Sequence, residues 1–197
     1  MQAEIEAKFL DIDLDDIRRR LRDAGAVCEI PMRLMKRITI ETPELKKMNA
    51  YLRVRDEGDK VTVTLKQHTG NTIDQAKEIN IVVNDFEQTI ELLKCLSLPY
   101  RSTQETKRET WKLGNAEVVL DEWPWLKPYM EIEADSESAV RGCAAKLGLK
   151  WDNAVFGDVM TAYSVQYPHL KNDQNIGDIS EIKFGMPLPD LLKGGDS

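Results

Sequence analysis

The run Glu4-Ile5-Glu6-Ala7-Lys8 stands at the start of the chain, and a close copy, Glu-Ile-Glu-Ala-Asp, occupies residues 131–135. Alternate residues of a β-strand share one face, so Glu4, Glu6 and Lys8 are expected to project together. Carboxylate oxygens are hard donors suited to Mg²⁺ or Mn²⁺, and a lysine beside them suits a phosphate. The two copies therefore predict strand faces that bind a metal ion and a phosphate group.

The 197-residue chain is long enough to bury a core, and we divide it into a domain over residues 1–170 and a C-terminal tail over 171–197. The tail has little sustained periodicity. Apolar residues alternate over 182–188, however, so the tail either packs back on the body or stays flexible.

Alternating strand-like segments, joined by short turns, dominate the first domain, with helical spacing at residues 13–24, 84–96 and 136–147. About eight strand segments with few helices favour an α+β fold, mainly antiparallel β, in which an eight-stranded sheet closes into a tunnel-like barrel with flanking helices. A barrel of this size can hold one small ligand.

One face of many of these strands is charged where an ordinary core would be apolar. For any single pair of like charges the simplest interpretation is a solvated face, because antiparallel sheets commonly expose one side to water. If the sheet closes, the charged faces converge, and metal ions with a polyphosphate would compensate them. The converging residues are Glu4, Glu6, Lys8, Arg53, Arg55, Lys66, Glu78, Asp121, Glu131 and Glu133.

The composition argues against several other classes of protein. A net charge of −7 disfavours binding to a nucleic acid duplex. No apolar run approaches the roughly 20 residues of a membrane span, and the charged N-terminus does not resemble a signal peptide. Three scattered cysteines without a C-x-x-C pair fit a reducing, cytoplasmic setting. A homodimer is compatible with the sequence.

In combination, these motifs resemble the CYTH family, also called triphosphate tunnel metalloenzymes. Residues 4–8 match the family's Glu-x-Glu-x-Lys signature, and further motifs follow in the family's order: Leu52-Arg-Val-Arg55, Thr64-Leu-Lys66, Thr106-Lys-Arg108, Leu120-Asp121 and Met130-Glu-Ile-Glu133. The resemblance implies an eight-stranded antiparallel tunnel that binds a triphosphate and a divalent metal. Family activities include inorganic triphosphatase, thiamine triphosphatase, RNA 5′-triphosphatase and class IV adenylyl cyclase.

The resemblance also implies roles for individual residues. Lys8, Glu4 and Glu6 are the expected catalytic residues. The expected ligands of Mg²⁺ or Mn²⁺ are Glu4, Glu6, Glu131 and Glu133, with Asp121 as a further ligand or an orienting group. The expected triphosphate contacts are Lys8, Arg53, Arg55, Lys66 and Arg108. The chain departs from the family at Thr106, where the family has a lysine, and at Thr39, near which relatives carry an aromatic residue.

The favoured function is metal-dependent hydrolysis of an inorganic or organic triphosphate. The alternative is a class IV adenylyl cyclase, which would convert ATP to cyclic AMP and pyrophosphate in the same tunnel. A non-catalytic polyphosphate-binding module and a purely structural barrel are further alternatives. The expected partner is a small-molecule triphosphate, with no membrane and no nucleic acid duplex, and the sequence does not identify the group attached to the phosphates.

Overall fold

A computed structural model describes residues 2–68, 76–171 and 173–194; the side chains of residues 2–4, 68 and 76 lie outside that description. The strands are β1 (Gln2–Phe9), β2 (Val27–Ile40), β3 (Ala50–Asp56), β4 (Val61–His68), β5 (Ala76–Val83), β6 (Ser102–Leu113), β7 (Ala116–Glu122), β8 (Tyr129–Ala134) and β9 (Glu181–Ile182). The α-helices are α1 (Leu14–Asp23), α2 (Pro43–Lys47), α3 (Phe86–Cys95), α4 (Glu137–Lys146) and α5 (Val159–Gln166). Short 3₁₀ helices occupy Trp151–Asn153, Ile176–Asp178 and Asp190–Leu192.

The described strands form a sheet in the order β2-β3-β4-β5-β1-β8-β7-β6-β9, and β2 pairs with β6 as well as with β3. All pairs are antiparallel except β6 with β9. The α+β class and the mainly antiparallel sheet are thus confirmed. The expected number of eight strands is corrected to nine, because residues of the C-terminal segment add the two-residue strand β9 beside β6.

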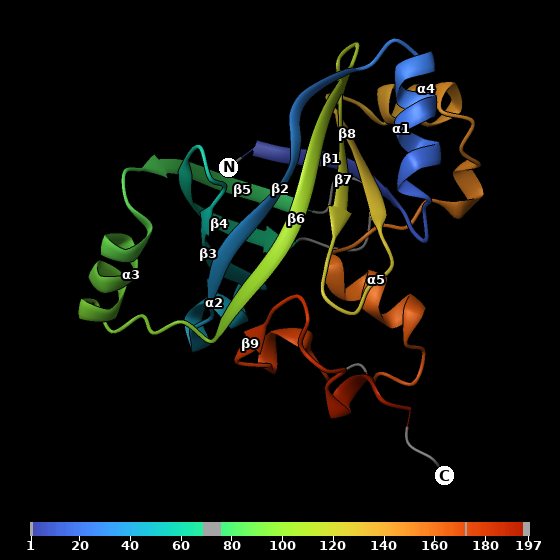
Figure 1. Cartoon of the computed structure of the whole chain (residues 1–197). Coiled ribbons are helices and arrows are strands. Elements are labelled where there is room, and N and C mark those ends of the chain that lie inside the picture. Colours follow the sequence, from blue (N-terminus) through green and yellow to red (C-terminus); the bar gives the residue numbers. More distant parts are fainter. Residues whose placement is uncertain (1, 69–75, 172, 195–197) are drawn as a thin grey trace.

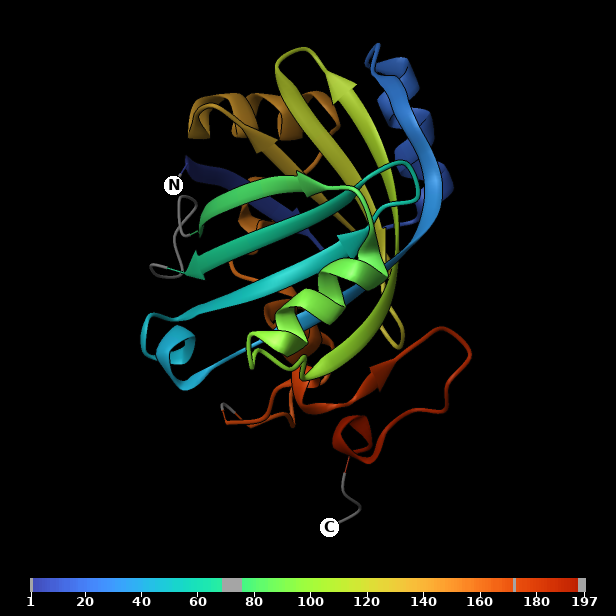
Figure 2. The same ribbon diagram turned by 90° about the vertical axis from the view of Figure 1, so that its left-hand side faces the viewer.

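Helices cover the apolar face of the sheet in two separate places (Figures 1 and 2). Ile17 and Leu21 of α1 and Val140 of α4 pack with outward-facing residues of β1 and β8, such as Ala7 and Ile132. On another side, α3 packs through Ile90 on a separate cluster that includes residues of β2 and β3. The apolar cores therefore lie between the sheet and its helices, and the opposite face of the strands carries the charged residues.

The described residues after 170 pack on one end of the sheet, beneath β6 and beside α5 in Figure 1. Ile176, Ile182 and Leu192 are buried in a cluster with Trp123 and Tyr163. The Trp125 indole also donates to the Met186 carbonyl at 3.0 Å. Within the described part of the chain, no helix is long and apolar enough to cross a membrane.

Candidate active site

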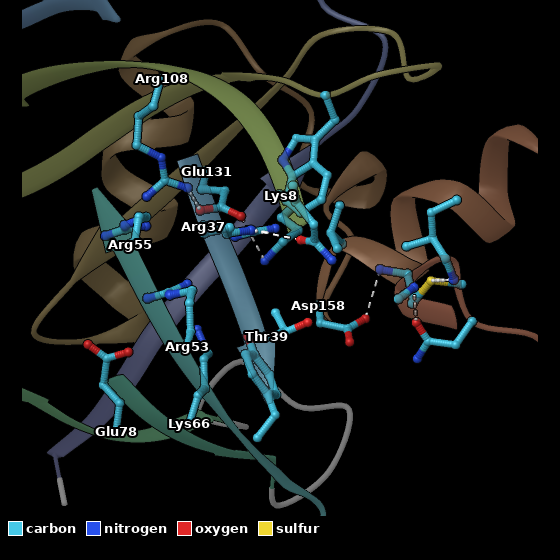
Figure 3. Close-up of a pocket in the computed structure, with 18 of the residues that line it drawn as sticks. Lys8, Arg37, Thr39, Arg53, Arg55, Lys66, Glu78, Arg108, Glu131 and Asp158 are labelled. Atoms are coloured by element: carbon cyan, nitrogen blue, oxygen red, sulfur yellow. Dashed lines mark hydrogen bonds and ion pairs between the residues drawn. The ribbon is translucent and has the colours of Figure 1, made fainter. Parts of the chain in front are cut away.

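The charged faces of the strands converge on one cavity of about 270 Å³. The close-up in Figure 3 shows cationic side chains from several strands pointing into this shared space. Of the predicted site residues whose side chains are described, all but one line it: Glu6, Lys8, Arg53, Arg55, Lys66, Arg108, Glu131 and Glu133. The exception is Asp121. The side chain of Glu4 lies outside the described residues, although its backbone pairs with Ala76 in β5.

Lys8 projects from β1 between two carboxylates. Its Nζ donates to Glu6 Oε1 at 2.8 Å and lies 3.2 Å from Glu131 Oε1, on the residue directly opposite in β8. Burial by itself lowers the pKa of Lys8, but the negative charges of Glu131 and Glu6 outweigh it and raise that pKa above its ordinary value. Lys8 is therefore a fixed positive charge at neutral pH and not a proton acceptor.

Glu131 links Lys8 to a second cation. Arg108 Nη2 donates to Glu131 Oε2 at 3.1 Å. Burial alone would raise the pKa of Glu131, yet the charges of Lys8 and Arg108 lower it to about 2. The carboxylate is thus ionised throughout the physiological range.

Asp121 lies behind Arg108, which stands directly opposite it in the β6–β7 register. Arg108 donates from Nε to Asp121 Oδ1 at 2.7 Å and from Nη2 to Asp121 Oδ2 at 2.5 Å. This two-point contact fixes the plane of the guanidinium. The arrangement fits the orienting role that was one of the two expected for Asp121.

Arg53 and Arg55 project from β3 on the same side of the sheet. Arg55 donates from Nε and Nη2 to Glu57 Oε1, at 3.0 and 2.6 Å. Arg53 donates from Nη2 to Thr64 Oγ1 at 3.4 Å, and its buried Nε has no hydrogen-bond partner. The two residues of this motif therefore differ: Arg55 has a carboxylate partner, whereas Arg53 has a hydroxyl.

Comparison with known proteins is consistent with this site. The family model described as CYTH domain matches residues 2–150, which is most of the chain. The chain belongs to the CYTH family. No curated protein sequence matches it.

Solved structures share the CYTH fold of this chain. The PH1012 protein from Pyrococcus horikoshii OT3 is 25% identical, with 77% of this chain and 93% of that chain covered and a TM-score of 0.64. A putative adenylate cyclase from Vibrio parahaemolyticus is 15% identical, with coverage of 83% and 98% and a TM-score of 0.68. A putative adenylyl cyclase from Hippeastrum, described as having a dominant triphosphatase activity, is 13% identical, with coverage of 79% and 91% and a TM-score of 0.54.

Arg37 of β2 lines the same cavity but was not among the predicted site residues of this CYTH protein. Its Nε donates to Gln104 Oε1 at 2.9 Å, and its Cζ lies 4.0 Å from the centroid of the Trp123 ring. Burial and the nearby charge of Arg53 lower the pKa of Arg37 to about 10. The signal was present in the sequence, because residues 37, 39 and 41 are polar and the intervening residues are isoleucines.

Two tyrosines also line the cavity without having been predicted, Tyr51 from β3 and Tyr129 from β8. Burial, together with the negative charges of Asp121 and Glu131, raises the pKa of Tyr129 well above its ordinary value. Tyr129 therefore keeps its proton and remains a hydrogen-bond donor. Tyr51 stands directly opposite Lys66 in the β3–β4 register.

Residues from the C-terminal part of the chain complete one side of the cavity. Asp158, at the start of α5, and Asn175 line it, and both also line an adjoining hollow of about 540 Å³. Arg101 lines both spaces and forms ion pairs with Glu41 and Asp178. The CYTH match ends at residue 150, so Asp158 and Asn175 come from beyond it.

Proposed function

We propose that this CYTH protein hydrolyses a triphosphate with the help of a divalent metal ion. The observation that supports this proposal is the lining of one cavity. Lys8, Lys66 and the arginines of β3 and β6 line it together with carboxylates of β1 and β8. Cations in such a space suit a polyanion, and the ionised carboxylates beside them suit a metal.

We propose further that the eight long strands enclose the substrate as a closed tunnel. The pairing of β2 with β6 supports this, because these strands stand first and eighth in the sheet order. The β2–β6 register runs from Val27↔Lys112 to Thr39↔Ser102 with two shifts. A tunnel would exclude bulk water and strengthen each contact between charge and phosphate.

The available donors fit a hard cation. Glu6 and Glu133 are directly opposite each other in the β1–β8 register, and Glu131 lies two residues from Glu133 on the same strand. Among the described residues no three His, Cys, Asp or Glu side chains form a metal-binding group. Mg²⁺ bound to phosphates characteristically uses only one or two carboxylates with several waters, so such a group is not required. One or two of Glu6, Glu131 and Glu133 would hold the ion, with Glu4 as a further candidate.

A bound divalent ion would neutralise charge on the phosphate oxygens. The chain's own cations would do the remaining positioning: Arg53, Arg55, Arg108 and Lys66 would hold the phosphate chain, and Lys8 would face the charge that develops on it. In hydrolysis the water oxygen bonds to one phosphorus, a bridging P–O bond breaks, and the water's proton passes to solvent. The products are orthophosphate and the shortened phosphate compound.

The group attached to the phosphates would extend into the adjoining hollow. Its lining by Tyr51, Asp158 and Asn175 offers an aromatic face and hydrogen-bonding groups that suit an organic group.

The test is a substrate panel with identified products: tripolyphosphate, thiamine triphosphate, ATP and 5′-triphosphate RNA, each with Mg²⁺ and with Mn²⁺. Glu6→Gln and Glu133→Gln should each lower kcat by about two orders of magnitude, the scale of losing a charge-stabilising group. Glu137→Gln, on the exposed surface of α4, is the matched control and should retain activity.

Circular dichroism and thermal melting would establish that each variant is folded. Full activity in a folded Glu6→Gln protein would overturn the proposed roles. Cyclic AMP and pyrophosphate as the products from ATP would assign the cyclase activity instead. Tight binding without turnover of any member of the panel would identify a polyphosphate-binding module.

A further inference from the structure

Positive charge is distributed unevenly in the cavity. Lys8, Arg55 and Arg108 each have a carboxylate partner within 3.2 Å. Arg37 has an amide oxygen and the face of Trp123 as its contacts, and within the described part of the chain no carboxylate forms an ion pair with it. Arg53 likewise forms no ion pair with a carboxylate in that part of the chain, and its hydrogen bond is to a threonine hydroxyl.

Arg37 and Arg53 are close enough to affect each other. They lie on adjacent strands, with Thr39 of β2 directly opposite Arg53. Both side chains line the cavity, and Figure 3 shows them pointing into it. The charge of Arg53 is, after burial, the largest cause of the lowered pKa of Arg37. Two like charges in a partly desolvated space repel each other unless an anion lies between them.

Both residues also retain unused donors. The buried Nε of Arg53 has no partner, and the hydrogen bond of Arg37 engages Nε alone and leaves its two terminal nitrogens available. The guanidinium fork matches the geometry of phosphate oxygens, and stacking on an aromatic ring keeps its plane in place. Trp123 packs against the Arg37 guanidinium and thus restrains its position.

We propose that Arg37 and Arg53 form an anion subsite that binds one phosphoryl group of the substrate between them. The inference rests on the proposed function in taking that anion to be a phosphoryl group of a triphosphate. It adds a recognition residue, Arg37, and assigns the pair to binding, whereas Lys8 and Arg108 belong to the carboxylate-lined part of the cavity.

The experiment measures binding of tripolyphosphate by calorimetry in EDTA, so that neither metal nor turnover is needed. Wild-type protein should bind, and Arg37→Gln should weaken binding at least tenfold. Arg37→Lys, which keeps the charge but not the fork, should give an intermediate loss. Arg22→Gln removes an exposed charge on α1 outside the cavity and should bind within twofold of wild type.

A purely structural arginine would behave differently without ligand. Glutamine at position 37 can still donate to Gln104, and the substitution removes a partly desolvated charge that repels Arg53. The ligand-free Tm of Arg37→Gln should therefore equal or exceed that of wild type, while the Tm rise caused by tripolyphosphate should shrink.

Several results would overturn the subsite: unchanged affinity in folded Arg37→Gln, a ligand-free Tm lowered by several degrees, or no metal-free binding by wild type. Failure of the proposed function has a different signature. Binding that depends on Arg37, without phosphate release from any triphosphate, would leave the subsite standing and remove the hydrolase. Phosphate release by the wild type together with unchanged affinity in Arg37→Gln would leave the hydrolase standing and remove the subsite.

Discussion

Glu57 is a buried carboxylate at the turn between β3 and β4, and it organises one end of the basic residues. It accepts hydrogen bonds from Arg55 and from Arg33 Nη2, the latter at 2.9 Å, and it lies 3.9 Å from the ammonium of Lys60. Burial by itself raises the pKa of Glu57, but Arg55, Lys60 and Arg33 together lower it below its ordinary value. Glu57 thus holds Arg55 in position, and we expect it to affect substrate binding only through that arginine.

Glu57→Gln should destabilise the protein at pH 7 by about 1–3 kcal/mol, because two arginines lose a charged partner. The folded-state pKa of Glu57 lies below the unfolded value, so its contribution to stability is present above the unfolded pKa of about 4.5 and is lost as the pH falls through the folded value. Urea unfolding of both proteins at pH 7, 5 and 4 should show the difference narrowing toward the acid end. Glu29→Gln, at an exposed site in β2, is the control. An equal difference at every pH would contradict the assignment.

At the scale of elements, the C-terminal segment is attached by specific contacts as well as by burial. Ile182 of β9 is fully buried, and its strand pairs with β6 beside Gln104. Ser102 Oγ donates to the Ile179 carbonyl at 2.6 Å, and Arg101 pairs with Asp178. Because β6 also carries Arg108, the segment supports a strand that forms the cavity wall.

Ile182→Ala should lower the free energy of unfolding by about 2–5 kcal/mol, the range for truncating a buried isoleucine. Ile81→Ala in β5 is the matched control, since Ile81 is 54% exposed and its truncation should change stability by about 0.5 kcal/mol or less. Chemical denaturation of the two variants measures both values. A loss at position 182 no larger than that at position 81 would mean that the segment is not held in place in solution.

At the scale of the whole molecule, the sheet is polar on the face that lines the cavity and apolar on the face that the helices cover. Residues with opposite properties alternate along β1, where Glu6 and Lys8 line the cavity and Ala7 and Phe9 are in the core. The same alternation in β2 and β3 brings the cations Arg37, Arg53 and Arg55 to this cavity, although the unfolded chain keeps them apart. A bound polyanion should stabilise that arrangement.

Tripolyphosphate should raise Tm in proportion to the logarithm of its concentration, reaching about 2.7 kcal/mol of added stability at 100 times Kd. Added salt should weaken the effect by screening the charges, although less than for an exposed site. Differential scanning fluorimetry across ligand and NaCl concentrations checks both statements. A Tm rise that is equal for tripolyphosphate and for a neutral polyol at the same concentration would contradict them.

Much of the site could be predicted from local sequence patterns, because side chains alternate between the two faces of a strand with a period of two residues. That period places Glu6 and Lys8 on one face and, at the adjacent pair Lys107 and Arg108, allows only one to enter the cavity. Arg108 does so, while Lys107 pairs with Glu122 at 3.6 Å on the other face. The helices over residues 13–24, 84–96 and 136–147 were likewise predicted from a local pattern, the helical spacing of their apolar residues.

The sequence by itself determined the sheet class and the charged face of each strand, because alternation is a local property of the backbone. Only the tertiary structure decided which charges have partners. Glu57 neutralises Arg55 whereas Arg37 and Arg53 have no carboxylate among the described residues, and Ile182 adds a ninth strand. Except for the contact of Glu57 with Arg55, which is only two residues away in the chain, those outcomes depend on which strands become neighbours. They are set by pairing between strands that are distant in sequence, such as β2 and β6, and no local sequence pattern specifies that pairing.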